Sequence, residues 1–281
     1  MATVLENDQT TQFQYPFRQE FSRSKGWFLP TEVVFWGCPS CGKTSAICAL
    51  LSLEGMSIDA ADPSPLTTSQ RPSLHSLPKQ GGLGRVLEGL GGSLSSQSLY
   101  VNAIHKPAWW TPRRPFTFVE VPLTGKTLPD VDLNRQLSQV HLLCIDCRQD
   151  LDMQVGRLTP VLRHLSFERY LDVTSALRIL IMKADLLNTP EGFRQDCAQS
   201  LVTAQLPRFW SDVQASLLRH GMLKPAEVRK ALWQPIAFSA GEAADERDAS
   251  PSGIPIIPDS RSAQHLFQDV IRPRCLRRQW W

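Results

Sequence analysis

The stretch that decides the fold is Glu32-Val33-Val34-Phe35-Trp36-Gly37-Cys38-Pro39-Ser40-Cys41-Gly42-Lys43-Thr44. Five residues of strand character run into Gly37, and the spacing from there to Thr44 is G-x-x-x-x-G-K-T. This is the pattern of a phosphate-binding loop between a buried strand and a helix. The apolar run 45–53 predicts a largely buried helix after the loop. Strand, loop and helix together predict a site for a polyphosphate.

Each part of this phosphate loop has an expected role. Gly37 and Gly42 are expected to adopt backbone angles closed to other residues and to let the main chain approach a phosphate. The stretch Cys38-Pro39-Ser40-Cys41 and the residues up to Thr44 are expected to bind phosphate oxygens through the backbone N–H groups that converge there, aided by the helix dipole. The Lys43 ammonium is expected to reach the terminal phosphates, and the Thr44 hydroxyl to ligate Mg²⁺.

Composition limits the class of protein. The chain has 281 residues, 42% of them hydrophobic, which is enough for a sizeable core. The net charge of +3 is too small to indicate nucleic acid as a partner. No apolar run has the length of a membrane span, and the polar stretch 1–14 lacks the apolar centre of a secretory signal. Seven cysteines in a chain of this length favour reduced thiols and a cytoplasmic location.

The rest of the chain alternates strand and helix patterns. Strands are predicted at 99–104, 115–121, 140–146, 177–182 and 235–238, and helices at 83–90, 159–171, 191–220 and 262–272, with a loop over 241–260. Such alternation predicts a three-layer α/β fold, a mainly parallel sheet with helices on both faces. The ligand is then expected at the carboxyl ends of the strands. Glu120 lies at such an end, where an acidic residue suits a Mg²⁺–water site.

The domain is expected to cover 31–272, with an N-terminal arm over 1–30 and a basic, aromatic tail over 273–281. The segment 57–98 is rich in Ser, Pro and Gly and predicts a long loop that closes over the nucleotide. Thr67 and Thr68 are candidates for a second Mg²⁺ hydroxyl. The loop and Trp109-Trp110 are candidate surfaces for a protein partner, and the tail is a candidate for membrane contact.

Three motifs together resemble the Ras-like and translation-factor-like class of P-loop GTPases. The first is the phosphate loop, which matches fully. The second is Met182-Lys183-Ala184-Asp185, similar to the family's Asn/Thr-Lys-x-Asp motif, and the third is Ser239-Ala240 after a short strand. The resemblance spans about 32–240. It implies GTP and GDP as ligands with Mg²⁺, and a molecular switch with GTPase activity.

The resemblance also implies residue roles in reading the base. Asp185 would accept hydrogen bonds from the guanine N1–H and 2-amino groups, a donor pair that adenine lacks. The stem of Lys183 would lie along the base plane, and the Ala240 N–H would donate to the guanine O6. Glu120 would hold the Mg²⁺ shell through water.

The departures from the family pattern carry their own expectations. Met182 replaces Asn or Thr, so a hydrogen bond between the two loops is missing. The family's Asp-x-x-Gly is represented only by Glu120-Val121-Pro122-Leu123, and no Gln or His follows in 126–128 to orient an attacking water. Slow hydrolysis, or hydrolysis completed by a partner, is expected. These features are more similar to divergent bacterial GTPase-like domains than to eukaryotic small GTPases.

Alternatives to this interpretation remain open. Asp146 also ends an apolar strand, and as the Mg²⁺ carboxylate it would favour an ATP-dependent enzyme. A nucleotide-binding scaffold without turnover is a third hypothesis. The pairs Cys38/Cys41 and Cys144/Cys147 have Cys-x-x-Cys spacing, which can indicate a zinc site or a redox switch. Small, buried, reduced thiols are the favoured interpretation.

Overall fold

The computed structural model describes the residues 28–58, 98–125, 128–129, 131, 133, 137–168, 170–171, 175–187, 193–222, 234–239, 241–243, 256–258 and 260–275. The predicted helix over 83–90 and the candidates Thr67 and Thr68 lie outside these residues, as does most of the arm 1–30.

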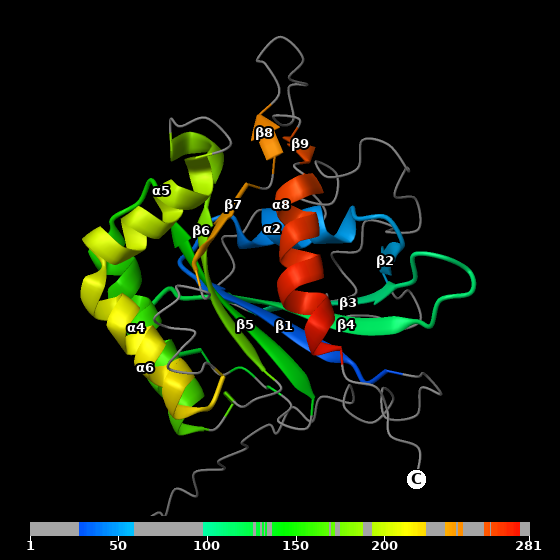
Figure 1. Ribbon diagram of the computed structural model, residues 1–281, viewed down its shortest axis with the longest axis horizontal. Helices are drawn as coiled ribbons and strands as arrows, with labels where there is room; N and C mark the ends of the chain where they lie inside the picture. The colour runs from blue at the N-terminus through cyan, green and yellow to red at the C-terminus, as the bar shows by residue number, and fades with distance from the viewer. Residues whose placement is uncertain are drawn as a thin grey trace, which may run out of the picture.

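A seven-stranded sheet organises the molecule, in the order β2-β3-β4-β1-β5-β6-β7 (Figure 1). The five strands from β4 to β7 in this order are parallel, whereas β3 and β2 are antiparallel additions at one side. The central strands are apolar on both faces, as strands covered by helices on both sides must be. Their bounds are β1 Thr31–Gly37, β2 Met56–Ile58, β3 Leu99–His105, β4 Arg114–Pro122, β5 Ser138–Asp146, β6 Ala176–Met182 and β7 Ile236–Phe238.

Helices cover both faces of the sheet and bury two separate apolar clusters. One face carries α2 (Lys43–Leu51) and α8 (Ser260–His265), which continues through the turns Leu266–Ile271 and Arg272–Arg274. The other carries α4 (Leu151–Phe167) and α6 (Pro207–Arg219), seen at the left of Figure 1, and is joined by α5 (Arg194–Ser200) and the π turn Leu201–Gln205. The predicted three-layer α/β architecture is confirmed, and with the phosphate loop after β1 it is the fold of P-loop NTPases.

The predicted strands are confirmed within one to two residues, but two helix predictions were wrong in extent. The helix predicted over 159–171 begins at Leu151, because the Asp150 side chain accepts a hydrogen bond from the Met153 N–H and caps it. Pro160 lies inside this helix rather than at its start. The region predicted as helical over 191–220 is divided before Pro207, which opens α6 at a position where a missing N–H is tolerated.

The polar segment 241–260 was predicted to be a loop, and this was wrong in part. Its described residues form two short antiparallel strands, β8 (Gly241–Ala243) and β9 (Ile256–Pro258). Three residues on each side are too few for a periodic pattern to stand out in the sequence. None of the helices in the described ranges has the length and apolarity needed to cross a bilayer.

A chain of buried polar groups links β1 to β5 beneath α4. The indole N–H of Trp36 donates to Nδ1 of His141 at 3.3 Å, and the other ring nitrogen of His141 lies 3.1 Å from Gln139 Oε1. Gln139 in turn donates to Glu32 at 3.0 Å. An acceptor at Nδ1 requires a neutral imidazole with the proton on Nε2. Accordingly, burial lowers the pKa of His141 from 6.5 to about 3.

Stability is expected to fall as the pH is lowered from about 6.5. The unfolded chain takes up protons on its histidines near pH 6.5, whereas His141 stays neutral in the fold and His105 has a pKa lowered to about 4 by burial, Arg114 and Arg272. The unfolded state then binds more protons than the folded state. Each of these two histidines therefore lowers the unfolding free energy by about 1.4 kcal/mol per pH unit below about pH 6.5. Denaturant titrations between about pH 7 and about pH 5 measure the slope.

The variant His141→Asn separates this effect from other titrating groups, because the amide oxygen can still accept from Trp36. Its slope of unfolding free energy against pH should be shallower than that of the native protein. Equal slopes in the two proteins would contradict the assignment of this acid sensitivity to His141.

Candidate functional site

The phosphate loop begins where β1 meets its neighbour β5 most closely. A Cβ on Gly37 would lie 2.8 Å from the Cys41 sulfur, 2.9 Å from the Cys144 carbonyl oxygen and 3.1 Å from the Cys144 Cβ. Gly37 is not among the residues with positive φ, so its predicted need for unusual backbone angles was wrong. What it provides is space, because the loop folds back over the place that a side chain would fill.

The turn itself uses left-handed backbone at two positions, Ser40 with φ 60° and Gly42 with φ 99°. Gly42 precedes the first residue of α2 and has no side chain with which to cap it. No side chain at the capping position therefore accepts from the N–H groups that begin the helix, and such groups are otherwise satisfied by water or by a ligand. Together with the helix dipole they make this end of α2 attractive to an anion.

Lys43 and Thr44 reach from the start of α2 to Glu120 on β4. The Thr44 hydroxyl donates to Glu120 Oε2 at 2.6 Å, and Lys43 Nζ lies 3.6 Å from Oε1 of the same carboxylate. Lys43 is almost fully buried and also donates to the Cys38 carbonyl oxygen at 2.8 Å. A cation, a hydroxyl and a carboxylate thus meet beside the loop, as the sequence predicted from three separate positions.

These residues fit a magnesium ion in the manner expected from the sequence. Mg²⁺ prefers oxygen ligands and keeps several waters, so one hydroxyl and one carboxylate beside phosphate oxygens are a sufficient protein contribution. Thr44 and Glu120 supply that pair 2.6 Å apart. Within the described ranges no group of three or more His, Cys, Asp or Glu side chains is arranged to hold a metal, so a cage made only of protein ligands has no support there.

The segment after β4 is attached to the loop and to α4. The Leu123 N–H donates to the Gly37 carbonyl at 2.9 Å, and the Leu123 carbonyl accepts from Arg157 at 2.8 Å. The same Arg157 nitrogen lies 3.8 Å from the sulfur of Cys38. Arg157 was missed by the sequence reasoning. An arginine in a helix carries no motif, and only the packing of α4 brings it beside the loop.

The second motif lies beside the first and is fixed by an ion pair. Met182 ends β6, and its Cε lies 3.4 Å from the position of a Cβ on Gly42, so an apolar contact joins the two loops in place of the missing hydrogen bond. Lys183 has φ 58°, and its ammonium pairs with the buried Asp146 carboxylate at 2.6 Å. Asp185 follows in the short helix Ala184–Leu187, partly exposed and near Cys147.

Asp146 is already engaged by its own neighbours. Besides Lys183, its carboxylate accepts from the Arg148 N–H and from the Gln149 side chain, each at 2.9 Å. Asp146, at the end of β5, therefore helps to hold the loop that carries Lys183 in place. Glu120, by contrast, lies within hydrogen-bond distance of Thr44.

The third motif is described only in part. Ser239 follows β7, is buried, and its N–H lies 3.5 Å from the Ser262 hydroxyl on α8. Strand β7 also contacts the short helix that carries Asp185, so both motifs border the same end of the sheet. Ala240 lies outside the described residues, and its predicted contact with guanine O6 stays a prediction.

The cysteines around the loop are free, buried thiols. Burial raises the pKa of Cys41 to about 11 and that of Cys48 to about 12, and it also raises the pKa of Cys144 well above its usual range. Protonated, enclosed sulfurs are poor nucleophiles and poor metal ligands. These environments favour the interpretation of the thiols as packing groups over the zinc and redox alternatives.

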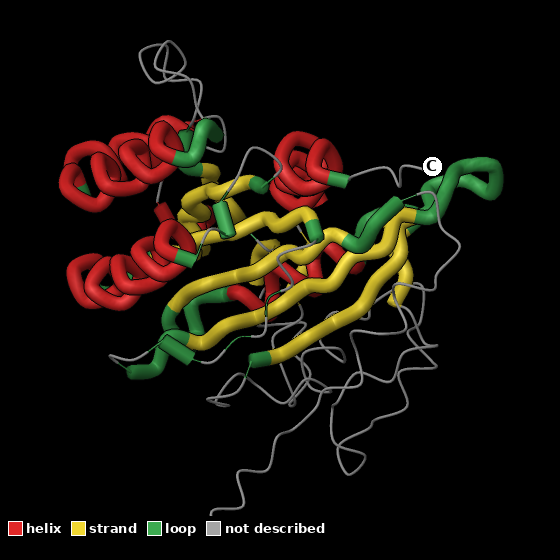
Figure 2. The backbone as a smooth tube through the Cα atoms, turned by 90° about the horizontal axis from the view of Figure 1, so that it is seen from below, coloured by secondary structure: helices red, strands yellow, loops and turns green. Residues whose placement is uncertain are grey.

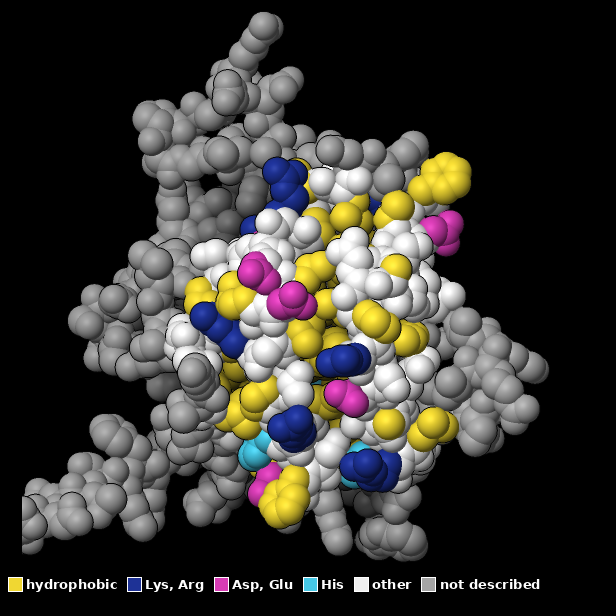
Figure 3. All heavy atoms as spheres, turned by 90° about the vertical axis from the view of Figure 1, so that its left-hand side faces the viewer, with side chains coloured by type: hydrophobic (Ala, Val, Ile, Leu, Met, Phe, Trp, Pro, Cys, Tyr) yellow, Lys and Arg dark blue, Asp and Glu magenta, His cyan; other side chains and the backbone are white. Residues whose placement is uncertain are grey.

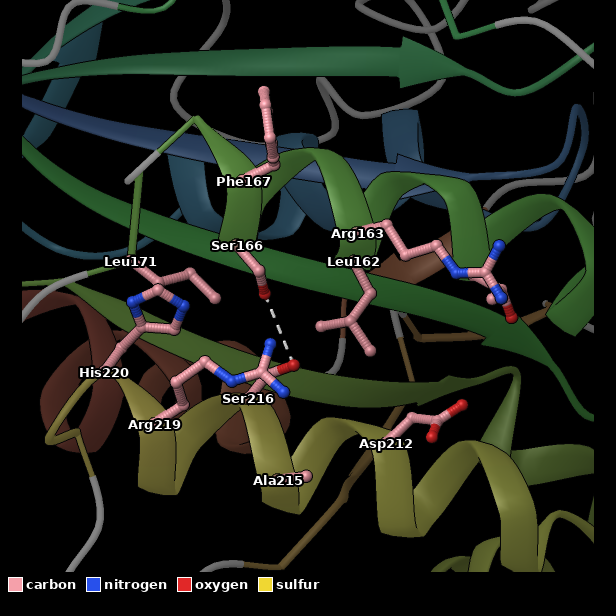
Figure 4. A pocket seen from close by; sticks show the side chains of 11 residues that line it. Leu162, Arg163, Ser166, Phe167, Leu171, Asp212, Ala215, Ser216, Arg219 and His220 are labelled. Carbon is pink, nitrogen blue, oxygen red and sulfur yellow. Dashed lines mark hydrogen bonds between the residues drawn. The ribbon is translucent and has the colours of Figure 1, made fainter.

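A groove of about 800 Å³ lies elsewhere, between the last turns of α4 and α6 (Figure 4). The Ser166 hydroxyl donates to Ser216 across it at 3.3 Å, and Arg163, Arg219 and Asp212 lie along its sides. Because α4 runs back from the carboxyl end of β5, these last turns point toward the amino edge of the sheet, away from the phosphate loop. Figure 3 shows charges of both signs interspersed with apolar side chains over this face.

Comparisons with known proteins give weak likenesses. No protein-family model matches the chain, and no curated protein matches it. Among solved structures, the GTPase-like domain of Ski7 from S. cerevisiae, bound to GDP and inorganic phosphate, has 19% identity and a TM-score of 0.42 over 86% of this chain and 50% of its own. The same domain bound to GTP has 17% identity and a TM-score of 0.38.

The septin GTPase domain from Chlamydomonas reinhardtii has 13% identity and a TM-score of 0.31 over 80% of both chains. This chain spans about half of the length of the Ski7 chains that it matches.

Proposed function

We propose that this chain binds GTP and GDP with Mg²⁺ at the carboxyl edge of its sheet and acts as a nucleotide-dependent switch that hydrolyses GTP slowly. The observation that supports this most is the meeting of Lys43, Thr44 and Glu120 beside a loop of free helix-end amides. The loop that carries Lys183 and Asp185 packs against the phosphate loop through the contact between Met182 and Gly42.

In the proposed complex the loop amides and Lys43 hold the β- and γ-phosphates. Lys43 then exchanges its bond to the Cys38 carbonyl for bonds to phosphate oxygens, which are stronger because both partners are charged. Thr44 and Glu120 would hold the Mg²⁺, the former directly and the latter through water. The ion would neutralise the charge that develops on the phosphates during transfer.

Guanine selection would rest on Asp185. A carboxylate held near the base accepts two hydrogen bonds from guanine, and it would be left unpaired with adenine, which offers no such pair of donors. The Asp146–Lys183 ion pair supports this by fixing the backbone of the loop just before Asp185. The stem of Lys183 is then positioned to pack along the ring.

Slow hydrolysis is proposed because Lys126-Thr127-Leu128, where family members place a Gln or His that orients the attacking water, contains neither. The Leu123 N–H, at the place where a family member senses the γ-phosphate, donates to Gly37 instead. Arg157 lies beside this segment, and its guanidinium donates to the Leu123 carbonyl. We therefore propose that a protein partner completes the hydrolytic site, with the segment 57–98 as the responsive part. Seven free cysteines support a cytoplasmic location.

A competition titration tests the proposal. Binding of fluorescent GTP by the native protein should be displaced by GTP and GDP but not by ATP. In Asp185→Asn the amide offers a donor where the carboxylate only accepted, so guanine affinity should fall by about a hundredfold while affinity for xanthine nucleotide, with its oxygen at C2, rises. The matched control Asp152→Asn, on the exposed side of α4, should change neither.

Other outcomes identify the alternatives. Preferential displacement by ATP would contradict guanine selection and favour the ATP-dependent hypothesis. Tight GDP that stays bound through purification, with no phosphate released from GTP, would favour the scaffold without turnover.

A further inference from the structure

The hairpin between β3 and β4 projects beyond the sheet at the right of Figures 1 and 2 and has no role in the proposed nucleotide site. At its tip, Trp109 is 82% exposed and Trp110 is 71% exposed. Their rings contact each other edge to face, with centroids 5.5 Å apart, and so form one apolar surface. Two adjacent exposed tryptophans on a protruding element usually mark an interaction site.

Hydrogen bonds hold the backbone of the tip in a defined turn, and this turn presents the two rings to solvent. The Thr111 N–H donates to the Ala108 carbonyl at 3.0 Å, and the Thr111 hydroxyl makes two further bonds to the Ala108 backbone. At the base of the hairpin, the backbone N–H of Lys106 donates to the Gly55 carbonyl at 2.7 Å. Gly55 itself adopts φ 78°, and a Cβ there would lie 2.4 Å from Pro107. A backbone that is already held in its turn loses little conformational entropy when the tip is buried.

The surroundings of the tryptophans are basic. Lys106, Arg113 and Arg114 flank them, and the sequence contains no Asp or Glu from 99 to 117. The neighbouring turn contributes one exposed acid, Glu54, so three positive charges face one negative charge.

One further arginine, Arg272, extends the positive charge toward the sheet. The pKa of His105 is lowered to about 4 by its burial and by the proximity of Arg114 and Arg272. Arg114 is held in place, with its guanidinium 5.0 Å from the ring centre of Phe28.

We propose that the hairpin tip is a docking site for an anionic lipid bilayer, with Trp109 and Trp110 inserted at the level of the headgroups. Tryptophan favours this interface because its ring is apolar and its N–H can still bond to water or headgroups. Basic side chains behind it are attracted to the negative surface of the bilayer. A protruding tip reaches a flat surface without rearrangement of the domain.

Cosedimentation with vesicles tests the proposal. The full chain should bind vesicles of phosphatidylcholine and phosphatidylserine, release them as salt is raised, and bind poorly to vesicles of phosphatidylcholine alone. The double variant Trp109→Ala/Trp110→Ala should bind the anionic vesicles at least about tenfold less. Lys106→Glu/Arg113→Glu should bind less by a similar factor at low salt while keeping both rings.

Two controls assign the effect to the tip. Phe167→Ala removes an aromatic side chain that is 84% exposed at the end of α4, and it should leave vesicle binding unchanged. Trp280→Ala/Trp281→Ala removes the tryptophans of the tail and should also retain most of the binding. All variants should keep the native unfolding midpoint and nucleotide affinity. A result against membrane docking can therefore be distinguished from a result against the proposed nucleotide binding.

Three results would overturn the proposal. The first is native affinity for anionic vesicles in the tip variants, and the second is loss of that affinity only in the tail variant. The third is a native chain that does not bind anionic vesicles at low salt, which would indicate that the tip meets a protein.

Discussion

Lys43→Ala is expected to lower the affinity for GTP by about a hundredfold, or on the order of 3 kcal/mol. The ammonium is the one side-chain cation that the described structure places inside the phosphate loop, 2.8 Å from the Cys38 carbonyl and 3.6 Å from Glu120. In the proposed complex its loss removes charge-assisted bonds to the terminal phosphates, for which the loop amides would not substitute. Titration of a fluorescent GTP analogue measures the change.

Lys43 also contributes to the fold, and the experiment has to separate the two effects. It is almost fully buried, so truncation leaves the Glu120 carboxylate without its cation and the Cys38 carbonyl without its donor. Stability of the nucleotide-free protein should therefore fall as well. The double variant Lys43→Ala/Glu120→Gln removes both charges and should recover part of the unfolding free energy without recovering affinity. Native affinity in Lys43→Ala would refute the proposed site.

Gly37→Ala is expected to destabilise the protein by about 3 kcal/mol or more, the upper range for an overpacked core. The new methyl would meet the Cys144 carbonyl oxygen at 2.9 Å and the Cys41 sulfur at 2.8 Å. Cys144 belongs to the central strand β5, whose backbone is held on both sides by β1 and β6 and has no room to withdraw. Urea denaturation followed by circular dichroism measures the loss.

The chain contains a matched control for this substitution. Gly156 lies on the exposed face of α4, where an added Cβ has no atom within 4 Å. Gly156→Ala should stabilise the protein by about 0.5–1 kcal/mol, since alanine favours a helix more than glycine does. The same chemical change thus has opposite signs at two positions. In a Cys41→Ala background Gly37→Ala should cost less but still destabilise, because the Cys144 carbonyl remains.

The sequence was informative where a residue has one physical reason to be there. The apolar strands that end at Gly37, Asp146 and Met182 had to be buried on both faces, and their alternation with helices predicted the parallel pairing that is observed. The loop motif then brought Lys43 and Thr44 to the carboxyl edge. Glu120 could be predicted to meet them because parallel strands end at a common edge.

Contacts that depend on tertiary packing were harder to predict from the sequence. Arg157 belongs to no motif, and its position depends on the angle at which α4 crosses the sheet. The start of α4 at Leu151 was missed because the single capping side chain of Asp150 is a weaker signal than Pro160, which in most sequences ends a helix. The role of Gly37 was misjudged because a requirement for space looks the same in a sequence as a requirement for positive φ.

Both outer strands of the sheet are only three residues long, β2 on one side and β7 on the other. A strand at the edge of a sheet presents unpaired N–H and C=O groups to which a second chain can add. The risk of such aggregation grows with the length of the strand. The longer apolar strands lie between these two outer strands, and β2 and β7 themselves offer only a short stretch of backbone to a second chain. The two short strands thereby limit edge-to-edge association at the residues that they cover, 103–105 of β3 and 180–182 of β6.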